Sequence, residues 1–236
     1  MRVDAQQRRS HSLRGRLNAT YVSQREKRRS LRDRGFASYS QFGEDAIVRS
    51  LVTGWDGGYI DIGSGHPVKF SNTYAFYKSG ARGLLVEPIA SNVDHTRLVR
   101  PEDLVVQSLC GPDELSVPFF EYEQYEYSTT SRERVDQLAL NGFRPVREYS
   151  LDVRTLASLV AETGLFRPDL LSVDVEGAEL GVLQSADWNR FRPAIIVVEE
   201  WTSPIEHVTP VSTYLSSLEY ELVALTGFSS VYRSRT

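Results

Sequence analysis

The chain has 236 residues, 41% hydrophobic and 25% charged, a composition that fits one folded globular domain and excludes a disordered chain. It has no apolar run near the roughly 20 residues that span a bilayer and no apolar signal-peptide core, so we expect a cytoplasmic protein without a membrane partner. The single cysteine, Cys110, excludes an internal disulfide and a paired zinc site.

Charge is unevenly distributed along the chain. Residues 1–37 contain 11 Lys and Arg against 3 Asp and Glu, whereas the remainder contains 16 against 28. We therefore expect a basic N-terminal arm, helical or flexible, followed by one domain at 38–236. Such an arm can contact nucleic acid, but its basic residues are not interleaved with aromatic ones and the body is acidic, which argues against that partner. A weak helical face at Leu13 and Leu17 instead indicates packing on the body or on a second copy in a homo-oligomer.

From about Phe36 onward, strand-like apolar runs alternate with longer helical patterns. This alternation is typical of an α/β fold with a doubly wound parallel sheet. The predicted elements are a helix at 40–54, a strand at 58–62, a helix at 72–79, and strands at 83–87 and 104–109, the last extended by 117–122. A helix at 156–160, a strand at 170–174, a helix at 178–185, a strand at 194–199 and a hairpin at 221–233 follow. Residues 123–145 have no clear period and are expected to form a lid or a disordered loop.

The strongest local signal is the strand end Asp61-Ile62-Gly63-Ser64-Gly65. Glycines there permit a tight turn and let a ligand approach the backbone. A dinucleotide site would add a third glycine and open a helix onto the pyrophosphate, but Pro67-Val68-Lys69 occupies that place. A cofactor without phosphates fits better, and Asp61 is placed to orient a cationic or hydroxyl-bearing one.

Acidic residues also end the later predicted strands. Glu87 is placed to accept hydrogen bonds from both ribose hydroxyls, or else it caps the turn before Pro88. Asp174-Val175-Glu176-Gly177 and Glu199-Glu200 end the fourth and fifth strands. Because ligands bind outside the carboxyl ends of parallel strands, these acids should face the same crevice as Gly63. The alternative for the 174–177 acids is a structural role at the start of the next helix.

These residues together resemble the FkbM-type methyltransferases, class I enzymes that use S-adenosylmethionine. The similarity runs in order through residues 39–201, in the segments Tyr39-Ser40-Gln41-Phe42-Gly43-Glu44-Asp45, Asp61-Ile62-Gly63-Ser64-Gly65-His66-Pro67, Phe70-Ser71-Asn72-Thr73-Tyr74, Asp174-Val175-Glu176-Gly177 and Trp188-Asn189-Arg190-Phe191-Arg192-Pro193. The resemblance implies a Rossmann-like doubly wound sheet of seven strands, mostly parallel with an antiparallel last strand. Ser64 replaces the alanine that is usual after the first glycine.

The resemblance also implies the cofactor and the reaction. S-adenosylmethionine would contact Asp61, Gly63 and Gly65, with Glu87 at the ribose and Ser108 and Leu109 beside the adenine. Other residues of the matching segments complete the expected cofactor-binding set: Gln41, Ser64, Asn72, Thr73 and Asp174. The implied reaction is O-methylation of a small-molecule hydroxyl acceptor, on a sugar, polyketide or related secondary metabolite.

This chemistry requires alignment of the acceptor oxygen and removal of its proton. The candidate base is Asp174 or His66, since an imidazole with a pKa of about 6.5 accepts a proton near neutrality. The alternative for His66 is a turn residue that bonds the backbone before Pro67. Glu176 and Glu200 are further catalytic candidates. Asp174 with Glu199 or Glu200 could also bind Mg²⁺, which prefers oxygen ligands.

Two other functions compete with this interpretation. A nicotinamide-dependent oxidoreductase can have the same architecture, although the missing third glycine argues against it. A non-catalytic member of the fold could use the basic arm to bind a partner, because fold alone does not establish function.

Overall fold

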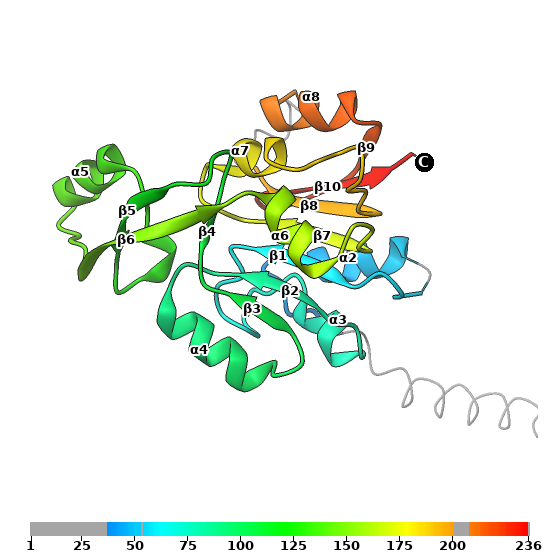
Figure 1. Ribbon diagram of the computed structural model, residues 1–236, viewed down its shortest axis with the longest axis horizontal. Coiled ribbons are helices and arrows are strands. Elements are labelled where there is room, and N and C mark those ends of the chain that lie inside the picture. The colour runs from blue at the N-terminus through cyan, green and yellow to red at the C-terminus, as the bar shows by residue number, and fades with distance from the viewer. Residues whose placement is uncertain (1–36, 53, 201–207, 236) are drawn as a thin grey trace, which may run out of the picture. The chain divides into compact units, whose positions relative to one another are not determined.

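The computed structural model describes residues 37–52, 54–200 and 208–235, so the predicted basic arm lies outside the described residues except for Ala37. In this part of the chain seven strands form one sheet in the order β3-β2-β1-β7-β8-β10-β9 (Figure 1). The strands are β1 (Tyr59–Ile62), β2 (Gly83–Val86), β3 (Leu104–Val106), β7 (Leu170–Val173), β8 (Ile195–Glu199), β9 (Tyr220–Thr226) and β10 (Ser229–Ser234). Strands β3, β2, β1, β7 and β8 are parallel, while β10 is antiparallel to both neighbours. The predicted doubly wound fold with an antiparallel last strand is confirmed.

Helices cover both faces of this sheet. Helices α2 (Glu44–Leu51), α3 (Tyr74–Lys78) and α4 (Ala90–Val99) pack on one face, and α6 (Leu156–Thr163), α7 (Glu179–Gln184) and α8 (Pro210–Ser217) pack on the other. The central strands are buried on both sides, which explains their continuous apolar runs. Successive strands spread outward from β1 in one direction and from β7 in the other. This switch in direction opens a crevice at the carboxyl ends of β1 and β7.

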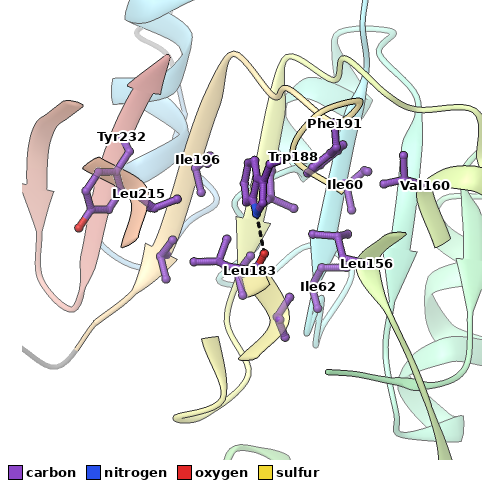
Figure 2. Packing of buried hydrophobic residues seen from close by; sticks show 14 of the residues in the cluster. Ile60, Ile62, Leu156, Val160, Leu183, Trp188, Phe191, Ile196, Leu215 and Tyr232 are labelled. Carbon is purple, nitrogen blue, oxygen red and sulfur yellow. Dashed lines mark hydrogen bonds between the residues drawn. The ribbon is translucent and has the colours of Figure 1, made fainter. Parts of the chain in front are cut away.

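Trp188 and Phe191 explain the sequence segment before β8. Both rings lie in the core beneath α6 and α8, with their centroids 5.6 Å apart, close to Ile60 and Ile196 (Figure 2). The Trp188 indole N–H donates to the Leu183 carbonyl oxygen at 2.8 Å, so its one polar group is satisfied inside the core. The segment therefore anchors the α7–β8 connection.

A second, three-stranded sheet extends from the main one. It consists of β4 (Leu109–Cys110), β5 (Ser116–Glu121) and β6 (Arg147–Arg154) in the order β4-β6-β5. The predicted strand at 104–109 is thus divided, because Leu109 leaves the main sheet to pair with Val153. Figure 1 shows β5, β6 and α5, in green at the left, reaching away from the main sheet. We call residues 116–154 the insert.

The prediction of a disordered loop at 123–145 is wrong, whereas the alternative of a lid stays a prediction. This stretch contains a 3₁₀ turn at Tyr125–Tyr127 and the helix α5 (Arg132–Leu140). The Ser131 hydroxyl caps α5 by accepting a hydrogen bond from the Arg134 N–H. A small separate core buries Val135 and Leu138 of the helix against the β5 side. With so few buried positions, the helix leaves little periodic signal in the sequence.

Three further elements were not predicted. Helix α4 buries only Val93 and Thr96, strand β6 has no buried residue, and α8 begins just after the undescribed residues 201–207. Within the described ranges, no helix has the length and apolar character to cross a membrane.

Candidate functional site

A cavity of about 680 Å³ lies at the carboxyl ends of the central strands. Its walls include the loop after β1, the end of β2, the β3–β4 connection, the loop after β7 and part of the insert. This is the crevice at which the strand order changes direction, and the volume lies within the range of small-molecule sites. The fold therefore places a ligand-sized space where the sequence analysis expects one.

The loop after β1 has a tight backbone. Gly63 has a φ of 79°, and a β-carbon built there would lie 1.7 Å from the Asp174 carbonyl oxygen. The neighbouring strand thus excludes any side chain at this position. Beyond Gly65 the chain bends through His66–Phe70, and helix α3 begins only at Tyr74. No helix N-terminus opens directly from the glycine loop, which removes the usual pyrophosphate site of a dinucleotide fold.

Asp61, Asn72 and Thr73, predicted to contact the cofactor, do not line the cavity. The Thr73 hydroxyl donates to Asp61 at 2.5 Å and accepts from Arg100 at 3.1 Å. Asn72 donates from its amide nitrogen to the Ser172 hydroxyl at 3.2 Å. Burial raises the pKa of Asp61, and its hydrogen bond to Thr73 opposes that rise. Asp61 and Thr73 thus belong to a buried polar network with Arg100 that joins β1 to the segment before α3.

Glu87 lines the cavity as predicted. One carboxylate oxygen accepts from the Gly65 N–H at 2.8 Å, and the other accepts from the Ile89 N–H at 2.9 Å and the Asn92 side-chain amide at 3.2 Å. Burial raises the pKa of Glu87 while these hydrogen bonds lower it. Glu87 therefore stabilises its turn, and its remaining lone-pair capacity can still accept ligand hydroxyls.

Ser64 and Ser108 supply the clearest sign of a polar ligand. Both side chains are buried, both line the cavity, and neither hydroxyl has a hydrogen-bond partner. Buried polar groups in proteins are nearly always paired, so these two fit a molecule that supplies the partners. Leu109 lies next to Ser108 in the wall.

Gln41 reaches the cavity from the segment before α2. The neighbouring Phe42 ring packs edge-on against Phe228 with centroids 5.3 Å apart. The Thr226 hydroxyl donates to Glu44 at 2.7 Å. These contacts hold the 39–45 segment against the β9–β10 turn, so two distant parts of the sequence share one wall.

Three carboxyl groups meet at the ends of β7 and β8. Oxygen atoms of Asp174, Glu176 and Glu199 all lie within 4.8 Å of one another. Burial and repulsion by Asp174 raise the pKa of Glu199, and one of its carboxyl oxygens is buried without a hydrogen-bond partner. Solvent in the cavity reaches Asp174, and its pKa rises less. The surrounding protein and repulsion by Asp174 raise the pKa of Glu176 to about 7, although its side chain is also solvent-accessible.

The family model of the methyltransferase FkbM domain matches residues 61–222, more than half of the chain. The chain belongs to the FkbM methyltransferase family. The resemblance inferred from the sequence is thereby confirmed, and the family implies S-adenosylmethionine as the methyl donor.

Solved structures similar to this FkbM family member include a TehB-like SAM-dependent methyltransferase from Corynebacterium glutamicum. It has a TM-score of 0.43 and 14% identity, covering 92% of this chain and 100% of that one. A precorrin-6y C5,15-methyltransferase from Geobacter metallireducens has a TM-score of 0.43 and 11% identity, covering 86% and 96%. At this similarity neither protein informs the activity of the chain. A comparison with curated proteins finds no matching sequence.

Glu200 of this FkbM family member does not join the three carboxyl groups. It is buried, accepts hydrogen bonds from the Tyr232 hydroxyl at 2.7 Å and from the Thr209 hydroxyl, and does not line the cavity. Side chains of consecutive residues in an extended strand point to opposite sides, so Glu199 and Glu200 cannot both face the ligand. The carboxyl group that accompanies Asp174 and Glu199 is Glu176.

His66 lines the cavity, but its ring is engaged with its own loop. Its Nδ1 accepts from the Val68 N–H at 3.1 Å and the Lys69 N–H at 3.0 Å. A neutral imidazole with an accepting Nδ1 carries its proton on Nε2, so neither nitrogen is free to take a proton. Burial, with the neighbouring His95 and Lys69, lowers the pKa of His66. This geometry favours the structural alternative and leaves Asp174 as the candidate base in the FkbM family member.

The insert contributes cavity residues that sequence reasoning did not assign. They are Glu126, Ser128, Thr129, Thr130 and Ser131, beside Tyr125 of the 3₁₀ turn. Glu179 was also missed: it accepts hydrogen bonds from the Val175 and Gly177 N–H groups and so shapes the loop after β7. The only signal in the sequence for these cavity residues was the high density of hydroxyl and acidic residues in 121–131. That segment shows no helical or strand periodicity.

Proposed function

We propose that this protein is an S-adenosylmethionine-dependent O-methyltransferase that acts on a hydroxyl group of a small molecule. The observation that carries the proposal is the pair of unpartnered hydroxyls, Ser64 and Ser108, in one cavity with the acidic groups of β7 and β8. The cavity offers hydrogen-bond partners for a cofactor and, separately, groups that can remove a proton from an acceptor. Neither phosphate recognition nor nucleophilic side chains are needed for this chemistry.

The residues present fit the cofactor that the family implies. Glu87, Ser64 and Ser108 would hold it, with the backbone of Gly63 and Gly65 in the same wall. When bound, this cofactor supplies a methyl group on a positively charged sulfur. Asp61 would act indirectly, because its carboxylate is engaged by the Thr73 hydroxyl outside the cavity wall. Binding in such a preorganised site would align the acceptor oxygen with the methyl group, which is the main contribution of proximity to this type of transfer.

Asp174 is the proposed general base. It is exposed to the cavity, and its pKa is raised from the ordinary value to about 6, which matches proton removal near neutrality. Glu199 lies beside it, with carboxyl oxygens of the two residues within 4.8 Å of each other. Replacement by Asn preserves the shape but removes the proton acceptor, so Asp174→Asn should lower kcat by about 10²–10⁴.

The oxidoreductase alternative receives little support from this cavity. A nicotinamide dinucleotide carries two phosphates, and phosphate sites use helix N-termini, Arg or Lys. Among the described lining residues, Lys69 is the one side chain with a fixed positive charge. The Mg²⁺ site stays a prediction, with Glu176 in place of Glu200 among its ligands. Loss of activity in excess chelator and its recovery with Mg²⁺ would support the site. Full activity in excess chelator would exclude it.

Calorimetric titration with S-adenosylmethionine and with NADH tests the cofactor. We expect binding of the former, weakened by Glu87→Ala and about five- to tenfold by Ser108→Ala, since one hydrogen bond contributes about 1 kcal/mol. The matched control is Thr96→Val, because Thr96 is also a buried hydroxyl without a partner but lies on α4 outside the cavity wall. Binding of NADH alone, or equal losses in Ser108→Ala and Thr96→Val, would overturn the assignment.

Three further expectations stay part of this proposal. The acceptor is a sugar, a polyketide or another secondary metabolite, the protein is cytoplasmic, and it forms a homo-oligomer. Size-exclusion chromatography with light scattering tests the last. A non-catalytic role would be supported if Asp174→Asn left the protein's biological activity unchanged while cofactor binding persisted.

A further inference from the structure

The wall of the cavity that comes from the insert is dense in hydroxyl groups. Ser128, Thr129, Thr130 and Ser131 are consecutive and all line the cavity, next to Tyr125 and Glu126 of the 3₁₀ turn. We call these six residues the polar wall. Tyr125 contacts the glycine loop, since a β-carbon built on Gly65 would lie 3.4 Å from its ring.

The polar wall and the carboxyl groups at the ends of β7 and β8 line the same cavity. The charge of Glu126 helps to raise the pKa of Glu176, and the charge of Asp174 helps to raise that of Tyr125. Side chains from the insert and from the main sheet thus share one electrostatic environment. An acceptor in this space would have both hydroxyl and carboxyl groups within the cavity that encloses it.

The charged groups that line the cavity are predominantly negative. Its described lining residues include six carboxyl groups, from Glu87, Asp113, Glu126, Asp174, Glu176 and Glu199, against one ammonium group, that of Lys69. Lys69 is itself exposed and lies 4.6 Å from the centre of the Phe70 ring.

We propose that the acceptor is a polyhydroxylated molecule without an anionic group, a neutral sugar or an amino sugar. This inference rests on the proposed O-methyltransferase function and specifies its substrate. The hydroxyls of Ser128, Thr129 and Ser131 each accept a hydrogen bond from a backbone N–H, but each keeps a proton to donate. Carboxylates only accept hydrogen bonds, so the two kinds of group together can pair with several hydroxyls of one molecule. A carboxylate or phosphate on the acceptor would meet like charge and find no Arg among the described lining residues to pair with.

The size of the discrimination follows from the distance between charges. Two like charges about 4 Å apart repel even in water, and more strongly in a cavity with low-dielectric walls. We expect kcat/KM to fall at least about fivefold for each negative charge added near the reacting hydroxyl. A positive charge should have no such cost.

The test is methyl transfer from S-adenosylmethionine by the full chain onto matched acceptors. The probes are glucose, glucosamine, glucuronic acid and glucose 6-phosphate, with the corresponding galactose and mannose sets. We expect transfer to the neutral and amine members, and at least fivefold lower kcat/KM for the anionic members. Glu126→Gln and Glu176→Gln should each narrow this difference. Glu133→Gln should not, because Glu133 is an exposed residue of α5, bonded to Gln137 and outside the cavity wall.

Each result decides something. Equal or better transfer to the anionic members would overturn the inference. So would S-adenosylmethionine binding without transfer to any member of any set, although the proposed cofactor function would survive that result. Failure of the cofactor to bind in calorimetry would instead overturn the proposed function, and the inference with it.

Discussion

Gly63 and the Asp174 carbonyl oxygen leave no space for a side chain between them, since a β-carbon on Gly63 would lie 1.7 Å from that oxygen. The Asp174 N–H also donates to the Ile62 carbonyl at 2.9 Å, which fixes the two strand ends side by side. The cofactor loop and the candidate base are therefore positioned by the same contact. A change on one strand must displace the other.

Gly63→Ala should destabilise the protein by at least about 2 kcal/mol more than Gly80→Ala. Both glycines have positive φ, 79° and 104°, but a β-carbon on Gly80 meets no atom within 4 Å, so only Gly63 adds a clash to the backbone strain. Urea unfolding of the two variants measures the difference. Equal losses would show that the strands separate freely.

Glu176→Gly should stabilise the protein by about 0.5–1 kcal/mol and lower methyl transfer at least about tenfold. Glu176 has a φ of 56°, a left-handed conformation that is unfavourable for a residue with a side chain. Glu219→Gly is the control, because Glu219 has a φ of 66° in an exposed turn outside the cavity wall. It should show a similar gain in stability with unchanged activity. If both variants keep full activity, the Glu176 side chain has no role in the reaction.

Arg100→Leu should destabilise the protein by about 3–5 kcal/mol, because it leaves the buried Asp103 carboxylate without its cationic partner. Arg100 is fully buried, donates to Asp103 at 2.8 Å, and contacts the hydroxyls of Tyr59 and Thr73 at 3.0 and 3.1 Å. At about 2–4 °C per kcal/mol, Tm should fall by roughly 10 °C. Arg82→Leu breaks an exposed pair with Glu102 and should shift Tm far less. A small shift for Arg100→Leu would mean that the network is dispensable.

Glu199→Gln should make stability less sensitive to alkaline pH. The folded protein raises the pKa of Glu199 above 4.5, so its contribution to stability is complete below that pH and is lost as pH rises through the folded value. Gln imitates the protonated form, and the variant should therefore gain on the wild type between pH 5 and 9 in urea unfolding. Glu221→Gln should run parallel to the wild type over this range, since Arg233 holds the pKa of Glu221 below its usual value of 4.5 and the group is therefore charged in both the folded and the unfolded state. A Glu199→Gln curve that is also parallel to the wild type would contradict the raised pKa of Glu199.

The central strands, their ends and the family were accessible from the sequence. Short apolar runs such as Leu170–Val173 are buried on both sides, so their composition alone identifies central strands. The glycines after β1 are required by a tight turn, and the acid after β2 bonds the backbone at the end of that strand. Both requirements involve neighbouring residues, so they can be recognised in the local sequence. For the same reason Glu87 and Gly63 were assigned correctly to the cavity wall.

Tertiary structure decided everything that depends on which way a side chain points or on what approaches from elsewhere. Glu199 and Glu200 are equivalent in sequence, but the strand turns one toward the cavity and the other toward Tyr232. His66 is a candidate base in sequence, yet two backbone N–H groups occupy its acceptor nitrogen. Asp61 is engaged by Thr73, and the polar wall comes from an insert with no periodic pattern. Composition and spacing show which chemistry a side chain is capable of. Long-range packing determines which of these side chains point into the cavity and keep free hydrogen-bonding groups there.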